Sequence, residues 1–480
     1  MLSASDTLQR FIIGLAPLPL AATTEPHTVK ETTGKQDVEG VAYDLTEVVR
    51  QQTVASHELV AFDPNADALW PGSLVQGKSL QTGVLAPIGL PRAAGTITLA
   101  TSLDVSQTSI VMERPSLAAA QQATRDLLAP VSGATPARLA FTSIQTESWQ
   151  QGLLAVGVKA DWLSGSAQAE FSSHSTSAGS LMAVKLTQAY YTLAFNPPEH
   201  PAGVFDPSVS VEAAGLYMGI DNPPVLISSV TYGRMLILIF RSSATAQELA
   251  AAVNAALHSA DQSGEIKIDA KLASTLRSSQ ITVLALGGSG ESVVKLIAGD
   301  PVLGLQAYLR EGATFSKSSP GVPISYLARY LRDNTTAGMA LTTSWTQRYL
   351  TGVDAIKEVK VGPRDGIVNT GIRIRAGDTI HISGTGTIWS GVIGSGGDVD
   401  PRGWHTWERP SEGGYPMQDV SPNCLVGRVD GVWFKVGPKY DETYQRLSDD
   451  LRLSVNTNNY TVGSGQWTIS IRIERRKETR

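Results

Sequence analysis

Tryptophans and carboxylates gather in the last quarter of the chain. Five of the nine tryptophans lie there, at positions 389, 404, 407, 433 and 467. Asp398, Asp400 and His405 lie close to Trp404 in the sequence. Pyranose rings stack on aromatic faces and hydrogen-bond to carboxylates. This composition predicts a sugar-binding platform in the Pro/Gly loop that carries Trp404, and we expect Trp404 to be exposed.

The other reactive side chains form no catalytic arrangement. The seven histidines are dispersed, and Cys424 is the single cysteine. The sequence contains no GxSxG, P-loop or HExxH motif. One cysteine forms neither an intramolecular disulfide nor a zinc-binding cysteine cluster. We therefore expect a protein that is not an enzyme and that needs no cofactor.

Length and charge restrict the partners. A chain of 480 residues suggests about three domains. With 39 Lys and Arg against 44 Asp and Glu the net charge is −5, so nucleic acid is not an expected partner. No apolar run reaches the ~18 residues of a membrane-spanning helix, so any insertion would need amphipathic strands.

The apolar stretch after Arg10 resembles a secretory signal, but Pro17 and Pro19 interrupt it. A cleaved signal and an N-terminal structural helix ending near Ala16 both remain open. We expect a soluble monomer that is released without a clear signal peptide.

Two regions differ in pattern. In residues 1–358, helical windows such as 116–128 and 246–258 alternate with β-branched runs such as 225–230 and 281–286, which predicts an α+β body. Residues 359–480 show short alternating strands separated by Gly, Asn, Asp and Pro, which predicts an all-β sandwich.

Two segments have the alternation of a membrane hairpin, with arms of about 8–10 residues against the ~9–11 that cross a bilayer. The apolar positions of the first, about 161–188, are Ala167, Ala169, Phe171, Met182, Val184 and Leu186. Those of the second, about 316–341, are Ile324, Tyr326, Ala328, Tyr330, Met339 and Leu341. Two alternatives stay open: an ordinary half-buried hairpin has the same pattern, and residues 324–331 also fit an amphipathic helix.

Several strings in residues 1–352 resemble the cholesterol-dependent (thiol-activated) cytolysins. They are 319–326 (SPGVPISY) with 330–334 (YLRDN), 227–234 (ISSVTYGR), 188–192 (QAYYT), 204–206 (VFD) and 286–288 (LGG). The resemblance implies an elongated body with a bent central antiparallel sheet flanked by two helical bundles. It further implies that the bundles unwind into the two hairpins at a target membrane, where many copies close into a transmembrane barrel.

Four residues acquire a role in assembly from this resemblance. Tyr191, with Tyr232, is expected at a sheet edge, where it would stack on a neighbour's strand, because cross-strand aromatic pairs contribute ~0.2–1 kcal/mol. Gly287 and Gly288 would form a bend from which an edge-covering segment swings away. The alternatives are core packing for the tyrosines and a simple turn for the glycines.

The C-terminal region departs from that family. The family's Trp-rich, Cys-containing loop has no counterpart in this sequence, so direct cholesterol recognition is doubtful. Residues 361–475 instead resemble the calcium-dependent galactose-binding bacterial lectins, in strings such as 369–372, 400–404 and 454–460. That resemblance implies a glycan receptor and a calcium ion held by the last loop. Asn456, Asn458 and Asn459 offer only neutral oxygens and Val462 offers none, so the calcium site is expected to be degraded.

Together the resemblances imply a pore-forming cytolysin that attaches through a lectin-like C-terminal domain and forms homo-oligomers on membranes. The alternative is a non-lytic carbohydrate-binding protein that retains the same fold. The weak apolar face of the first hairpin, with Gly165, Ala167 and Ala169, favours that alternative.

Overall fold

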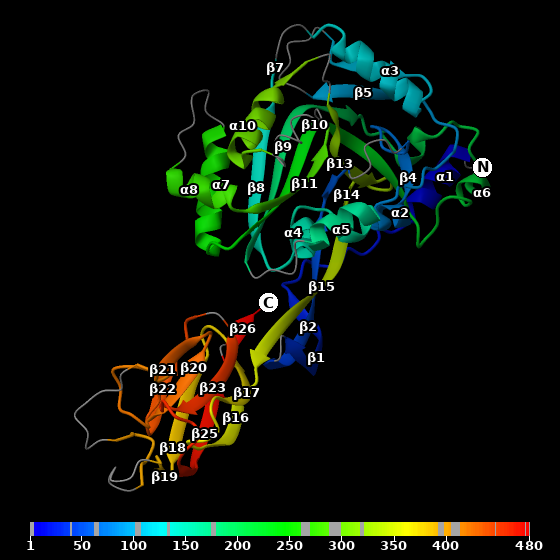
Figure 1. The fold of residues 1–480 in the computed structure, drawn as a ribbon. Helices are drawn as coiled ribbons and strands as arrows, with labels where there is room; N and C mark the ends of the chain where they lie inside the picture. The colour runs from blue at the N-terminus through cyan, green and yellow to red at the C-terminus, as the bar shows by residue number, and fades with distance from the viewer. Residues whose placement is uncertain are drawn as a thin grey trace. The chain divides into compact units, whose positions relative to one another are not determined.

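The computed structural model describes residues 4–38, 41–61, 67–100, 107–131, 135–173, 179–260, 269–287, 299–316, 321–391, 398–404, 413–446, 448–475 and 477–479. These residues form a large antiparallel sheet covered by helices, and a β-sandwich (Figure 1). The helices are α1 (Ala4–Ile13), α2 (Gly77–Thr82), α3 (Leu117–Leu128), α4 (Trp149–Ala155), η1 (Ala160–Trp162), α5 (Gly165–Ser173), η2 (Pro201–Val204), α6 (Val211–Ala214), α7 (Ala246–Ala260), α8 (Ala270–Arg277) and α10 (Pro301–Glu311). The strands before residue 331 are β1 (His27–Val38), β2 (Val41–Ser56), β3 (Glu58–Val60), β4 (Leu74–Gln76), β5 (Gly95–Ala100), β6 (Ser109–Met112), β7 (Thr135–Pro136), β8 (Arg138–Thr146), β9 (Ser180–Phe195), β10 (Pro224–Ser242), β11 (Gln280–Leu286), β12 (Thr314–Phe315) and β13 (Val322–Tyr330). The later strands are β14 (Thr336–Ala337), β15 (Met339–Gly352), β16 (Ala355–Val361), β17 (Val368–Ile374), β18 (Thr379–Thr385), β19 (Ile388–Trp389), β20 (Leu425–Val429), β21 (Val432–Lys435), β22 (Lys439–Thr443), β23 (Asp449–Val455), β24 (Ser464–Gly465), β25 (Trp467–Glu474) and β26 (Lys477–Thr479).

The α+β body predicted for the first part of the chain is confirmed, and so are the helical windows that became α3 and α7. Contacts divide the chain into two compact units, one of Met1–Val29 with Val49–Trp345 and one of Lys30–Val48 with Thr346–Arg480. This division differs from the expected boundary at 358/359, because β16 crosses that position as one continuous strand.

Strand β10 is the longest strand of the ten-stranded sheet, and its apolar, β-branched sequence suits burial on both faces. Along one edge it pairs with β4 and then β9; along the other it pairs with β13 up to Gly233 and with β11 from Met235 onward. Register shifts between 231 and 233 mark a bulge at this change of partner. The bulge allows one long strand to serve two groups of neighbours.

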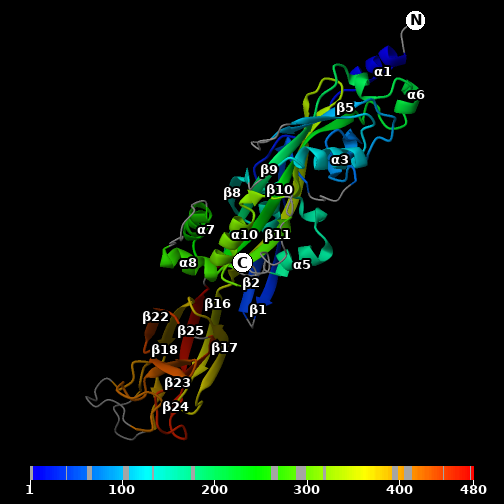
Figure 2. The same ribbon diagram turned by 90° about the horizontal axis from the view of Figure 1, so that it is seen from above.

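Helices cover both faces of the sheet. Met182, Val184 and Leu186 of β9 pack with α7, α8 and α10 on one face. Leu181 and Ala183, the alternate residues, pack with α4 and Phe171 of α5 on the other face. Figure 2 shows α7 and α8 on one side of the sheet and α5 on the other. The two flanking helical groups implied by the resemblance are therefore present.

The expected N-terminal helix is α1, which ends at Ile13 rather than near Ala16. Leu8 and Ile12 are buried in a cluster that also contains Leu74, Phe205 and Met218. Pro17 lies four residues past the end of the helix, where its ring is compatible with the end of helical structure.

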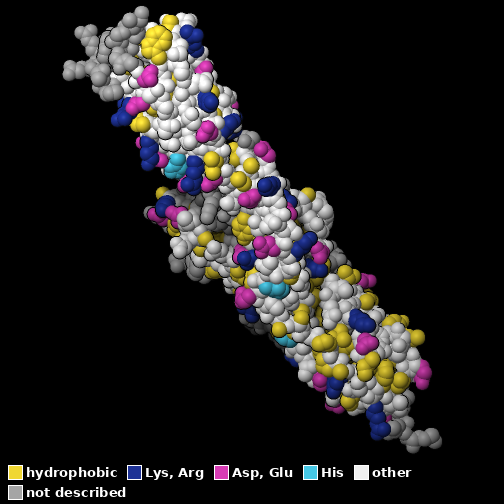
Figure 3. Space-filling model, turned by 90° about the horizontal axis from the view of Figure 1, so that it is seen from below, with side chains coloured by type: hydrophobic (Ala, Val, Ile, Leu, Met, Phe, Trp, Pro, Cys, Tyr) yellow, Lys and Arg dark blue, Asp and Glu magenta, His cyan; other side chains and the backbone are white. Residues whose placement is uncertain are grey.

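The predicted C-terminal sandwich is confirmed. Its two four-stranded sheets have the orders β16-β25-β18-β22 and β17-β23-β20-β21, and β19 pairs with β24 at one end. Both sheets turn apolar residues into one core that includes Val361, Ile380, Leu453 and the fully buried Trp467. In the described part of the chain no helix is long and apolar enough to cross a membrane. On the face shown in Figure 3, side chains of both charge signs are interspersed.

Candidate functional site

Two helical segments interrupt a run of neighbouring strands. Strands β8, β9, β10 and β11 lie side by side and antiparallel. The first segment, residues 147–180, starts and ends where Thr146 of β8 faces Leu181 of β9. The second, residues 242–279, starts and ends where Arg241 of β10 faces Gln280 of β11. Each segment therefore connects two strands that are already hydrogen-bonded to each other. If the segment became extended, the hydrogen bonding between these two strands could continue into it.

The first segment is helical where a strand was expected. Residues 165–173 form α5, and Ala167 and Ala169 lie on it. Phe171 is buried and stacks on Trp149 with ring centroids 5.5 Å apart. Alanine is a strong helix former, so the alternation of small residues did not distinguish a strand from a helix. Met182, Val184 and Leu186, expected on the returning arm, do lie in a strand, β9.

The second expected segment is already part of the sheet. Residues 322–330 form β13, which pairs with β10 and β3 and turns back into β14. The helical alternative for residues 324–331 is therefore wrong, and residues 331–335 form the turn between β13 and β14. The six apolar residues named for this segment are all buried: Ile324, Tyr326, Ala328, Tyr330, Met339 and Leu341. In the described residues 321–341 no helix is present to unwind, so the structure gives no support to 316–341 as the second membrane hairpin.

The helix at 246–258 was predicted from the sequence, but the second segment, α7 with α8, was not singled out as a candidate hairpin. Its signal was present: residues 249, 251, 253, 255 and 257 are apolar, and in residues 265–277 apolar even positions alternate with charged or polar odd ones, apart from Ala273 and Ser274. The tip of this pattern includes residues 261–268, which lie outside the described residues. Strong helical periodicity of alanine in 246–257 concealed the alternation, because alanine suits both periods.

Helix α7 is held on the sheet by apolar contacts and by a polar one. Leu249, Val253 and Leu257 are almost fully buried against β9 and β10. The Oγ of Ser143 on β8 donates a hydrogen bond of 3.0 Å to Oδ1 of Asn254. Glu248 of α7 pairs with Lys271 of α8 at 2.9 Å, and the hydrogen bond from Lys271 lowers the pKa of Glu248 to about 2.

Tyr191 and Tyr232 face each other inside the molecule. They are register partners on β9 and β10, and their rings stack with centroids 5.0 Å apart and planes at 13°. Burial raises the pKa of Tyr232 to about 12 and raises that of Tyr191 as well. Tyr191 is therefore not at a sheet edge in this structure, and its stacking on a neighbour's strand stays a prediction. The pair fixes the internal register of β9 and β10 next to the bulge.

Gly287 has a positive φ of 72° directly after β11, so the chain does turn there. Gly288 lies outside the described residues. A Cβ on Gly287 would come within 3.0 Å of Val322, and one on Gly321 would come within 2.8 Å of the Gly233 backbone. These glycines allow β10, β11 and β13 to approach at the change of partner. Their role in a swinging segment stays a prediction.

The expected sugar platform is not formed as predicted. Trp404 is only 9% exposed and packs in the sandwich core, so it cannot present its face to a ligand. The positive φ of Gly403 at 82° turns the chain so that Trp404 points inward. Asp400 pairs with Arg402 at 3.0 Å, Asp398 is exposed, and His405 lies outside the described residues.

The amides of the last loop do not fit a calcium site. Asn456 is fully buried, and its side chain accepts from the N–H and donates to the carbonyl of Met417. Oδ1 of Asn459 accepts from the backbone and the hydroxyl of Thr461. Asn458 is exposed. The oxygens of Asn456 and Asn459 accept hydrogen bonds that shape the loops, so these two positions give no support to a calcium site, and its loss stays a prediction.

Trp389 is the exposed tryptophan that sequence analysis did not single out. It is 41% exposed, and it pairs with Ser464 across the β19–β24 ribbon. At the same end of the sandwich, the hydroxyl of Thr387 donates to Asp398 at 3.3 Å. The exposed aromatic side chain at this end is thus Trp389 rather than Trp404, and it follows Ile388, which pairs with Val399 next to Asp398.

Solved structures share this fold. Intermedilysin matches with a TM-score of 0.58 at 20% identity, over 97% of this chain and 90% of that one. Listeriolysin O matches with a TM-score of 0.57 at 17% identity, over 94% and 86%. Pneumolysin matches with a TM-score of 0.56 at 18% identity, over 99% and 94%.

Sequence comparison gives closer relatives over a shorter span. Streptolysin O of Streptococcus pyogenes serotype M3 is 31% identical over 214 residues, which are 44% of this chain and 36% of that protein. Listeriolysin O of Listeria monocytogenes serotype 4a is 34% identical over 153 residues, 32% of this chain and 28% of that protein. The match thus spans about a third of the length of these relatives. The family model of the thiol-activated cytolysins matches residues 31–351, which is about two thirds of the chain. The chain belongs to the thiol-activated cytolysin family.

Proposed function

We propose that this protein forms pores in target membranes by converting its two helical segments into β-hairpins, with several copies joined in one barrel. One observation carries the proposal: each segment is inserted between register partners, Thr146 with Leu181 and Arg241 with Gln280. Extending residues 147–180 and 242–279 would continue existing strand pairs without changing any register. The inserts hold 34 and 38 residues, so each arm would have about 17–19 residues against the ~9–11 that a tilted strand needs.

The chemistry of the second insert supports this conversion. As strands, residues 249–257 would turn Leu249, Val253 and Leu257 to one face, and these residues are buried against the sheet in the present conformation. The same apolar surface would thus be covered by the sheet before conversion and by lipid after it. Membrane β-strands have this alternation of apolar and polar faces.

We further propose that attachment lies in the C-terminal sandwich and that the receptor is a glycan. The exposed Trp389 supports this, since its neighbour Ile388 pairs with Val399 on the segment that carries Asp398. The departure from the family's Trp-rich loop supports attachment that cholesterol alone does not provide. One solved structure of intermedilysin is a complex with human CD59, so a relative does bind a protein receptor.

A disulfide between α7 and β8 tests the conversion. The side chains of Ser143 and Asn254 are in contact, so Ser143→Cys with Asn254→Cys should close a bond after oxidation. The oxidised variant should bind target membranes but release no vesicle contents, and reduction should restore release. The matched control is Ala328→Cys with Ala337→Cys, which links register partners of β13 and β14 that are already strands.

The outcomes separate the candidate functions. Full release by the oxidised Ser143–Asn254 variant would refute conversion of α7. Membrane binding without release by the unmodified protein, on red cells and on vesicles bearing cell-surface glycans, would identify it as a non-lytic carbohydrate-binding protein. Loss of release in both oxidised variants would mean that the disulfides act elsewhere in the fold.

A further inference from the structure

A row of polar and aromatic side chains crosses the outer face of the sandwich sheet β17-β23-β20-β21. Register places Trp433 opposite Arg428, Arg428 opposite Arg452, and Arg452 opposite Asn369. The alternate residues of these strands, such as Val429 and Leu453, point into the core. We name the four residues Trp433, Arg428, Arg452 and Asn369 the cationic row.

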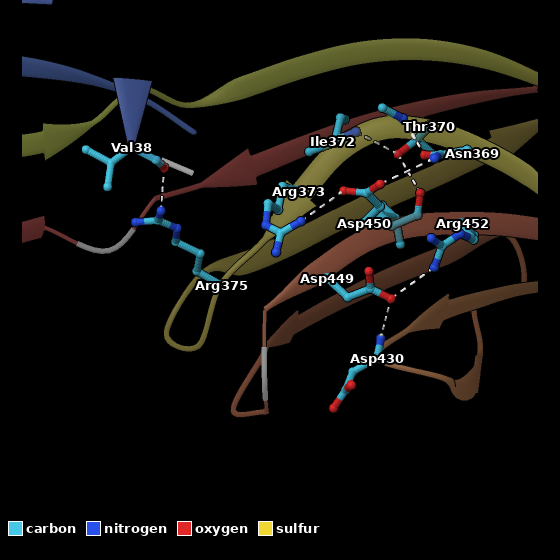
Figure 4. Close-up of polar contacts among 12 residues, drawn as sticks. Val38, Asn369, Thr370, Ile372, Arg373, Arg375, Asp430, Asp449, Asp450 and Arg452 are labelled. Carbon is cyan, nitrogen blue, oxygen red and sulfur yellow. Dashed lines mark hydrogen bonds and ion pairs between the residues drawn. The ribbon is translucent and has the colours of Figure 1, made fainter. Parts of the chain in front are cut away.

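The two arginines at the centre of the cationic row differ in their partners. Arg452 pairs with Asp449 at 2.9 Å. Hydrogen bonding from the backbone of Asp450, assisted by Arg452, lowers the pKa of Asp449, so this carboxylate is charged at neutral pH. Arg373 has a similar partner in Asp450, at 3.7 Å. Figure 4 shows Arg452 turned toward Asp449 and Arg373 turned toward Asp450.

Arg428 has no such partner. Within the described parts of the chain no carboxylate forms an ion pair with it, and its Nε is buried without a hydrogen-bond acceptor. Its guanidinium lies 5.6 Å from the centroid of the Trp433 ring. Like charges directly opposite across a sheet repel, so Arg428 beside Arg452 is a position where an anion would be stabilised.

The position of Arg428 is fixed by a tight turn. Asp430 and Gly431 alone connect β20 to β21, and both have positive φ, 49° and 72°. This is the geometry of a two-residue hairpin that matches strand twist. A Cβ on Gly431 would lie 3.8 Å from Nη2 of Arg428, so the guanidinium reaches back toward the turn. A site on a rigid hairpin needs little reorganisation to bind a ligand.

We propose that the cationic row binds an acidic sugar, one that carries a carboxylate or a sulfate group, and so supplies the glycan specificity of the attachment domain. This rests on the proposed glycan attachment and places the binding of the acidic group at the cationic row, a position other than Trp389. The anion lies against Arg428, the half-buried Trp433 borders the sugar ring, and Asp449 and Asp450 accept hydrogen bonds from hydroxyl groups.

The surrounding charges favour a sugar over an anionic lipid surface. Arg373 and Arg452 form ion pairs with Asp450 and Asp449, and the backbone N–H of Asp430 donates to Asp449, so carboxylates accompany the arginines of this face. Attraction to an anionic bilayer needs an excess of basic residues on the facing surface. A sugar with one anionic group and several hydroxyl groups suits this arrangement: the anionic group can bind the Arg428 guanidinium, and the hydroxyl groups can donate to the carboxylates of Asp449 and Asp450.

Binding of full-length protein to sialyllactose, to a sulfated heparin disaccharide and to neutral lactose, measured by calorimetry, tests the proposal. At least one acidic sugar should bind at least tenfold more tightly than lactose. Arg428→Gln should weaken that binding tenfold or more, and Trp433→Ala should weaken it as well. The control Arg472→Gln removes an equal charge from an exposed arginine on β25, of the other sheet, and should change nothing.

Three results would overturn the proposal: equal affinity for lactose and both acidic sugars, no binding of any of them, or full affinity in Arg428→Gln. Arg428-dependent binding to glycan-free phosphatidylserine vesicles would reassign the cationic row to a lipid headgroup. Melting temperatures equal to the parent's show that the variants fold. Calorimetry measures sugar binding independently of pore formation. A protein that binds an acidic sugar but releases no vesicle contents would therefore refute only the proposed pore. A protein whose release of vesicle contents is unchanged in Arg428→Gln would refute only this binding site.

Discussion

The substitution Gly233→Ala tests whether the bulge in β10 is as closely packed as the structure indicates. A Cβ at this position would lie 2.1 Å from the carbonyl oxygen of Gln188 and 3.0 Å from the Cα of Ala189. Both neighbours are backbone atoms, so no side-chain rotation relieves the clash. In Gly233→Ala, β9 and β10 must move apart at the bulge and lose one or two backbone hydrogen bonds. Overpacking at ~1–3 kcal/mol and one or two lost hydrogen bonds at ~0.5–1.5 kcal/mol each add to about 1.5–6 kcal/mol of lost stability.

Urea unfolding followed by fluorescence measures this loss through the transition midpoint. The matched control is Gly34→Ala, because nothing lies within 4 Å of a Cβ built on Gly34. That variant should stay within about 0.5 kcal/mol of the parent or gain slightly, since alanine reduces the freedom of the unfolded chain. A Gly233→Ala protein as stable as the Gly34→Ala protein would show that the bulge relaxes freely and would refute the reasoning.

Three further predictions concern residues with contacts described above. Trp404→Ala should lower the free energy of unfolding by ~3–5 kcal/mol, as for other buried aromatics, and sugar binding by the folded fraction should be unchanged; reduced affinity at equal stability would count against burial of Trp404. Cys424 is fully buried and its pKa is raised to about 11 by burial, so at pH 8 a thiol reagent should label it only after unfolding, and rapid labelling of native protein would contradict this. The Glu248 carboxylate, with its pKa lowered from 4.5 to about 2, should stabilise α7 and α8 above pH 4.5 and lose that effect as pH falls toward 2; the melting temperature of Glu248→Gln should therefore fall less than the parent's over that range, and identical pH profiles would show that the pair with Lys271 contributes nothing.

Long, strongly patterned elements could be predicted from the sequence. The β-branched run of β10, the alternating strands of the sandwich and the alanine-rich α7 all form as expected. These segments agree with one period only, or are long enough for one period to dominate. The prediction of which residues of β13 and β15 share one apolar face was likewise correct, because alternation over many residues fixes which side chains point inward.

Other features depend on contacts that local sequence does not encode. The strand expected at 163–171 is a helix, because Phe171 packs on Trp149 and alanine does not resist helix formation. Trp404 was expected in solvent from its loop neighbours, yet a single positive-φ glycine turns it into the core. The stacking of Tyr191 on Tyr232 depends on which strand lies next to β9, and the sequence of β9 alone does not specify that neighbour.

The hydrophobic core of the sandwich draws all of its buried residues from positions 361–473. Among the described residues this core takes none from the helical segments, so the surface loops and outer sheet faces of the sandwich can change without repacking those segments. Receptor preference and the membrane-active machinery could then diversify separately among related proteins. Differences between relatives should be concentrated on the outer strands and end loops of this sandwich, while the paired strands that bracket the two inserts vary less.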